Sequence, residues 1–247
     1  MFKFLRNKLL NKKWLNACLL LGIVLLVAVA SCNPMFKNGA MDMTLASKFD
    51  SAIEDNNTYS AVVGRQGSCS TDNFPDSASV LDRINAYEKK WMSYIDVPVL
   101  SRQNRLFIEG TYAMTGLGSR RFFSVNYMQD MSEHINITFG EGLDTGKPVE
   151  GTYPVIINQQ NADTYDLVVG ETVSIDKLVD KDGKPVTFTV VGIFEPKDTT
   201  DIYWKETPVD FDKMIFTDQA SFDATVANYG VLTIYYATYN MLDYAYI

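Results

Sequence analysis

Ser174 and Lys177 have the Ser-x-x-Lys spacing of enzymes in which a serine nucleophile works beside a lysine. In those enzymes the motif opens a helix and has companion motifs. Here the surrounding residues "ETVSIDKLV" continue a strand pattern, and the companion motifs are missing. We therefore expect these two residues to be structural.

The glycine-rich stretch "GEGLDTGKP" (residues 140–148) approaches two functional loops. A phosphate-binding loop needs a glycine where Glu141 stands and a hydroxyl where Pro148 stands. Asp144-Thr145-Gly146 matches an aspartic protease triplet, but that mechanism needs two carboxylates sharing a proton, and this triplet occurs once. We expect a turn that binds no nucleotide.

His134 is the only histidine, so a serine or cysteine triad would have to use it. No nucleophile elbow lies near "MSEHINITF", which favours a hydrogen-bonded or solvated histidine. Asp180, Asp182 and Lys184 break the calcium-loop pattern at its third ligand, and no Cys/His cluster has zinc spacing. We expect no catalytic residue, no cofactor and no metal site.

Residues 195–206, "EPKDTTDIYWKE", are acidic and predict a solvated loop. Tyr203 and Trp204 are its only apolar aromatic residues, and they indicate a contact surface. The tyrosines of the C-terminal stretch, Tyr235, Tyr236, Tyr239 and Tyr244, favour half-buried packing over a ligand site.

Helical spacing of apolar residues appears in three places after the uncharged run of residues 14–36. Residues 38–57 predict a helix, and residues 64–77 then predict a loop. Residues 77–96 predict a second helix whose apolar and aromatic stripe is expected to face the core: Val80, Leu81, Ile84, Tyr87, Trp91, Met92 and Ile95. A further helix is expected from Asp218, its cap, to Gly230.

Between and after these helices the pattern is typical of strands. Residues 99–114 and 120–128 predict a hairpin, and residues 152–160 a strand before a short helix. Residues 180–183 predict a turn between two paired strands, and residues 213–217 and 231–239 two more strands. The fold expected is therefore α/β in composition, α+β with a mixed sheet.

Residues 14–36 carry no charge and are rich in Leu, Val, Ala and Ile. Such a run is long enough to cross a hydrocarbon core of about 30 Å. Five basic residues precede it, which predicts a cytoplasmic N-terminus (residues 1–13), a transmembrane helix (14–36) and an extracytoplasmic domain (37–247). The protein would then be a single-pass protein of the cell membrane.

The same residues also fit a signal peptide that ends at Cys32. In that alternative Cys32 is acylated and the chain is a lipid-anchored surface binding protein. Only Cys69 lies beyond it, so no disulfide framework is expected in either case.

The first acidic residue is Asp42, so the chain beyond the apolar run is more acidic than the net charge of −8 of the whole. An acidic body without a basic stripe excludes nucleic acid as the expected partner.

Two stretches resemble a known family. "NKKWLNACLLLGIVLLVAVASCNPMFKNGAM" is similar to the first membrane helix of FtsX-like ABC transporter permeases of Gram-positive bacteria. "YPVIINQQNADTYDLVVGETVSI" and "FTVVGIFEP" resemble the MacB-type extracytoplasmic (periplasmic core) domain in order and spacing. The resemblance extends from Asn11 to about Tyr239.

The resemblance implies a transport function without catalysis in this chain. ATP would be hydrolysed by a separate cytoplasmic ATP-binding subunit. The permease would contact membrane lipid and would form a dimeric or pseudo-dimeric assembly. The family has three more membrane helices after the outer domain, and no further long apolar run precedes Ile247. A truncated permease is the corresponding expectation.

Overall fold

The computed structural model describes residues 13–56, 59–108, 113–115, 121–179, 182–205, 211–228 and 233–246. The chain divides into two compact units, residues 1–50 and residues 51–247. The elements are α2 (Lys13–Asn56), β1 (Val62–Ser70), α3 (Ser77–Met92), β2 (Val99–Ile108), β3 (Ala113–Thr115), β4 (Arg121–Phe122), β5 (Ser124–Met128), η1 (Met131–Glu133), β6 (Ile135–Gly140), β7 (Tyr153–Asn158), α4 (Gln159–Tyr165), β8 (Thr172–Val179), β9 (Pro185–Pro196), β10 (Met214–Phe216), α5 (Gln219–Asn228), β11 (Thr233–Leu242) and η3 (Tyr244–Tyr246).

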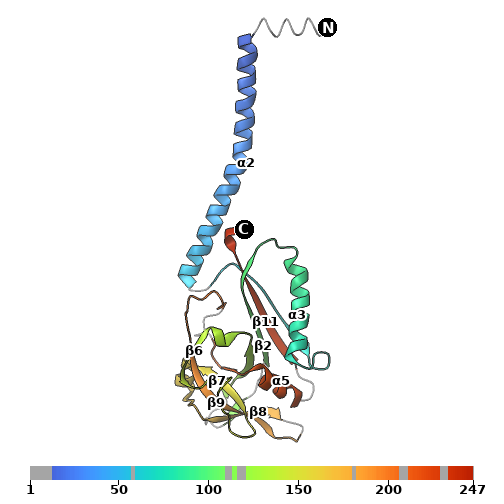
Figure 1. Cartoon of the computed structure of the whole chain (residues 1–247), viewed down its shortest axis with the longest axis vertical. Coiled ribbons are helices and arrows are strands. Elements are labelled where there is room, and N and C mark those ends of the chain that lie inside the picture. Colours follow the sequence, from blue (N-terminus) through green and yellow to red (C-terminus); the bar gives the residue numbers. More distant parts are fainter. Residues whose placement is uncertain are drawn as a thin grey trace. The chain divides into compact units, whose positions relative to one another are not determined.

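Helix α2 is continuous over 44 residues and is drawn in blue in Figure 1. It joins the uncharged run (residues 14–36) and the amphipathic stretch (residues 38–57), which the sequence predicted as a helix continuing from that run. The backbone stays helical through Pro34, a residue that usually ends or kinks a helix. The large apolar side chains between Leu19 and Val29 are 55–71% exposed. Within the described residues, no helix combines the length and the apolar character required of a membrane span.

The described strands of the second unit form one mixed sheet with the order β1-β11-β2-β5-β10-β7-β9-β8-β3-β4, and β6 pairs with β9. β2 and β11 run side by side as antiparallel strands (Figure 1). β10 is parallel to β5, and β7 is parallel to β9. The sheet therefore contains both orientations, which confirms the predicted mixed α+β fold.

Apolar residues on the two faces of the sheet enter different cores. Val155 and Ile157 of β7 belong to a large core that also includes Val80 of α3 and Phe222 of α5. Ile156, which points to the opposite face because strand side chains alternate, belongs to a second core with Phe194 and Phe216. A strand buried on both faces explains the uninterrupted apolar run "PVII" in the sequence.

Local capping explains where the helices begin. Asp76 accepts a hydrogen bond from the backbone N–H of Ser79 (2.7 Å) and starts α3 with a capping box. Asp218 accepts from the N–H of Ser221 (2.8 Å) and starts α5, as predicted. Ser77 at the start of α3 also donates to Asp223 of α5, so the start of α3 is tied to the middle of α5.

Asn161 of α4 holds the segment before β10 in place. Its side-chain amide donates to the carbonyls of Phe211 (2.8 Å) and Met214 (3.1 Å), and its oxygen accepts from the N–H of Lys213 (3.1 Å). Lys213 has a positive φ of 58°. These three bonds hold a backbone conformation that lysine seldom adopts.

Strand β1 corrects the loop predicted for residues 64–77. Its polar and glycine-rich residues, "VVGRQGSCS", have low strand propensity, but all of them pair with β11. A Cβ on Gly64 would lie 2.6 Å from the ring of Tyr239, and one on Gly67 would lie 2.5 Å from the hydroxyl of Tyr236. The glycines therefore make room for tyrosine rings that cover them, and the strand forms at the edge of the sheet.

Candidate functional site

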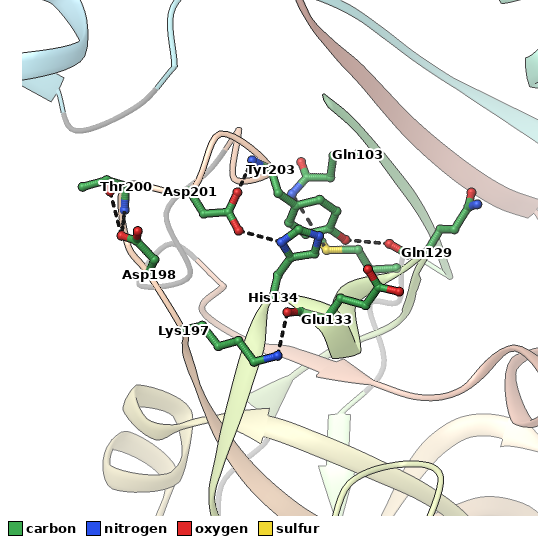
Figure 2. A network of polar contacts seen from close by, with 10 residues as sticks. Gln103, Gln129, Glu133, His134, Lys197, Asp198, Thr200, Asp201 and Tyr203 are labelled. Atoms are coloured by element: carbon green, nitrogen blue, oxygen red, sulfur yellow. Dashed lines mark hydrogen bonds and ion pairs between the residues drawn. The ribbon is translucent and has the colours of Figure 1, made fainter. Parts of the chain in front are cut away.

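The only histidine of the chain lies at a junction of three segments. His134 follows η1 and precedes β6, and its Nδ1 is hydrogen-bonded to Oδ2 of Asp201 at 2.6 Å (Figure 2). The two side chains are 23% and 27% exposed, so the pair is partly shielded from water. The predicted hydrogen-bonded histidine is confirmed, with a partner that lies 67 residues away in the sequence.

The ring of Tyr203 is stacked on the imidazole of His134, with 3.7 Å between centroids and 2° between planes. Its hydroxyl donates to the carbonyl oxygen of Gln129 at 2.6 Å. Burial raises the pKa of Tyr203 well above its ordinary value, with the negative charge of Asp130 as a further cause. Trp204 meets the Tyr203 ring edge-on at 4.8 Å.

Tyr203 and Trp204 are each only 2% exposed, so the contact surface predicted for residues 195–206 is wrong at these positions. The two rings enter the second core beside Phe211 and Phe216. The sequence did not predict the burial of these two rings, because their neighbours in the sequence are polar. Their burial depends on packing against distant elements.

Residues 197–204 form a segment that we call the latch. The N–H of Lys197 donates to the carbonyl of His134 (2.9 Å), and its ammonium donates to the carbonyl of Glu133 (2.7 Å). Asp198 accepts from the N–H and the hydroxyl of Thr200, and these bonds lower the pKa of Asp198. The latch is thus fastened to η1 and closes over the second core.

The chemistry available at the latch is limited. A histidine paired with a carboxylate supplies two members of a triad, and the third must be a nucleophile within hydrogen-bonding distance. In the described part of the chain, the contacts of the imidazole are with Asp201, Tyr203 and Trp204. The arrangement holds two segments together and has no nucleophile among these contacts.

A pocket of about 430 Å³ lies next to η1, and we call it the acidic pocket. Part of its wall is apolar and comes from Met128, Met131, Ile135, Leu143 and Ile156. The rest of the lining includes Asp130, Asp144 and Asp218. Its residues come from β5, η1, β6, β7, the loop after β6 and the start of α5, so no single stretch of sequence encodes it.

A second hollow, of about 530 Å³, lies between the end of α3 and β1. Tyr87 and Trp91, predicted to face the core, are 39% and 63% exposed there, so the predicted burial of the aromatic part of this helix stripe is wrong. The stripe is buried only in its first half, at Val80 and Ile84, because the helix extends past the region in which it packs against the core. Arg65 lies over the ring of Tyr87 at 4.4 Å.

The structure places the other candidate residues of the sequence in separate parts of the fold. Residues 142–146 form a turn in which Gly146 donates to the carbonyl of Gly142 (2.7 Å), as predicted. Ser174 and Lys177 lie within β8, which confirms the strand, and Cys32 is exposed in α2. Asp180 lies outside the described residues, and Asp182 is in an exposed turn. Tyr236 and Tyr239 are buried, at 6% and 9% exposure, so their predicted packing role is confirmed.

The chain is similar in structure to the periplasmic region of MacB from Actinobacillus actinomycetemcomitans, with a TM-score of 0.35 and 10% sequence identity over 64% of each chain. It is also similar to a domain of a protein described as a permease from Porphyromonas gingivalis, with a TM-score of 0.33 and 13% identity over 62% of this chain and 66% of that one. The chain thus spans less than two thirds of the MacB region. No family model matches the chain, and no curated protein is significantly similar to it in sequence.

Proposed function

We propose that this chain supplies the first membrane helix and the outer domain of an ABC permease. Residues 1–13 lie in the cytoplasm, residues 14–36 in the membrane and residues 37–247 outside it. A separate cytoplasmic subunit hydrolyses ATP, and this chain converts the resulting movement of its membrane helix into export or mechanical work outside the cell. The chain itself has no enzymatic activity in this proposal.

Helix α2 is the observation that carries the proposal. It begins in the uncharged run and continues without a break to Asn56, with its apolar side chains exposed along the first half. Exposed apolar surface of this extent calls for a lipid or protein environment. A helix of 44 residues is about 66 Å long, whereas about 20 residues cross a bilayer, so roughly half of it is left to continue outside the membrane.

The partners follow from the family that the sequence resembles. We propose that the uncharged run contacts membrane lipid, that an ATP-binding subunit docks on the cytoplasmic side, and that two permease halves assemble as a dimer or pseudo-dimer. Continuity of the helix supports this proposal, because a stiff helix transmits a tilt from one end to the other.

Intact-mass measurement of the membrane-extracted chain, combined with protease treatment of sealed cells, tests the proposal. We expect a chain that retains residues 1–31 and whose body is cleaved by protease added outside. A chain that begins at Cys32 and carries acyl groups would contradict the membrane helix and support a lipid-anchored surface binding protein. A body protected from external protease would contradict the topology.

A further inference from the structure

The acidic pocket has the size and the wall of a site for a small organic molecule. Its volume of about 430 Å³ falls within the range of roughly 300–1,000 Å³ of typical ligand pockets. Met128, Met131, Ile135 and Ile156 supply apolar surface, and the methionine side chains adapt readily to different shapes. The pocket can therefore accommodate the apolar part of a ligand.

The charged residues that line this pocket are all acidic. Asp130, Asp144 and Asp218 line it, and no lysine or arginine is among the described residues that do. Asp218 keeps both oxygens engaged with Ser221 at the start of α5. The side chain of Asp130, in contrast, makes no capping bond to η1.

This negative charge affects the pKa of a neighbouring group, Tyr127. Tyr127 is among the residues that line the pocket, and its pKa is raised by burial and, in addition, by the charges of Asp130 and Asp223. In the described part of the chain, the ion pairs use other carboxylates: Glu88, Asp201 and Asp212. The three aspartates of the pocket thus leave net negative charge beside an apolar wall.

We propose that the acidic pocket binds an organic cation with an apolar body. The apolar residues receive the body, and the carboxylates of Asp130 and Asp144 attract the positive charge. This ligand class does not depend on the permease proposal, because it follows from the wall of the pocket alone.

Benzyltrimethylammonium and its uncharged carbon isostere, neopentylbenzene, are matched probes for this site. We expect the full chain in detergent to bind the cation in a saturable way, measured by equilibrium dialysis above the background of detergent alone. The isostere, which has the same shape, should bind about tenfold more weakly or worse, and added salt should weaken only the cation.

The double variant Asp130→Asn and Asp144→Asn tests which residues attract the cation. Asparagine is well tolerated at the positive φ of 60° of Asp130, and it retains the turn at Asp144, so the fold should be kept and can be verified by circular dichroism. We expect about a tenfold loss of cation binding or more. Asp82→Asn, which removes the same charge from the exposed face of α3, should leave binding unchanged.

The positive group could belong to a free small molecule or to a protein side chain, and a further pair of probes separates these sources. Acetyl-Phe-Arg-amide presents the same chemistry from a peptide, with acetyl-Phe-norleucine-amide as the uncharged control. Tighter binding of the peptide cation identifies a protein ligand, and tighter binding of benzyltrimethylammonium identifies a small molecule. Equal binding of charged and uncharged probes, unchanged binding to the double variant, or no binding of either cation at millimolar concentration would overturn the proposal.

Discussion

The imidazole of His134 lies parallel to the phenol ring of Tyr203, with 3.7 Å between their centroids and 2° between their planes. The same imidazole is hydrogen-bonded to Asp201, two residues before that tyrosine. One side chain between η1 and β6 therefore contacts both ends of a short turn of the latch. This relationship gives the latch a stabilising role that can be measured.

Replacing the histidine should loosen the latch. His134→Ala removes a partly buried hydrogen bond and a stacked ring, and we expect it to lower the free energy of unfolding by about 1–3 kcal/mol. Urea unfolding measures this effect. In a double-mutant cycle with Asp201→Ala, the two losses should add to more than the loss in the double variant. Additive losses would show that the pair does not act as a unit.

Alkaline pH should destabilise the second unit (residues 51–247) through Tyr203. Its pKa is raised in the folded protein, while in the unfolded chain the group loses its proton near pH 10. Above that pH the folded state binds more protons than the unfolded state, so the free energy of unfolding decreases as the pH rises, and the contribution is complete only below pH 10. Urea unfolding between pH 9 and 11 should show a smaller decrease for Tyr203→Phe than for the wild type. Tyr94→Phe, at an exposed position, is the control and should follow the wild type.

The glycines of β1 should resist substitution. In Gly64→Ala the new methyl group meets the ring of Tyr239, and we expect a loss of about 1–3 kcal/mol in unfolding free energy. Ser68→Ala, on the same strand and exposed, should have an effect within about 0.5 kcal/mol. Recovery of stability in the double variant Gly64→Ala, Tyr239→Leu would trace the loss to the ring, whereas the same loss in that background would point elsewhere.

Asn161 should be among the most sensitive polar positions of the domain. Asn161→Leu keeps the approximate shape but removes three hydrogen bonds to backbone groups around Lys213, and we expect a loss of about 3 kcal/mol or more. Gln160→Leu on the exposed side of the same helix is the matched control. Thermal unfolding of both variants makes the comparison, and similar melting temperatures would show that these hydrogen bonds contribute little.

The sequence predicted elements whose residues follow a regular period. Val80 and Ile84 have helical spacing and are buried in α3, and the apolar run of β7 is a strand covered on both faces. In these elements the local pattern and the tertiary packing favour the same structure. The predicted strand pairs at residues 99–128 and 172–196 are confirmed for the same reason.

The sequence did not predict features that depend on distant contacts. β1 is polar and glycine-rich, and only its pairing with β11 and the rings of Tyr236 and Tyr239 make it a strand. Trp204 is buried although its neighbours in sequence are polar, because it packs against Phe211. The partner of His134 and the aspartates of the acidic pocket come from separate elements, and no spacing in the sequence relates them.

The most direct test of the proposed function is to break the stiffness of α2 between membrane and outer domain. The chain is purified from its native membranes with its P-loop subunit and reconstituted, and transport driven by ATP hydrolysis is compared with that of a variant carrying six Gly/Ser residues after Lys37. We predict that the subunit co-purifies with both chains and that the insertion abolishes transport while ATP hydrolysis continues. Unchanged transport with the insertion, or purification of the intact chain without any ATP-binding subunit, would contradict the account.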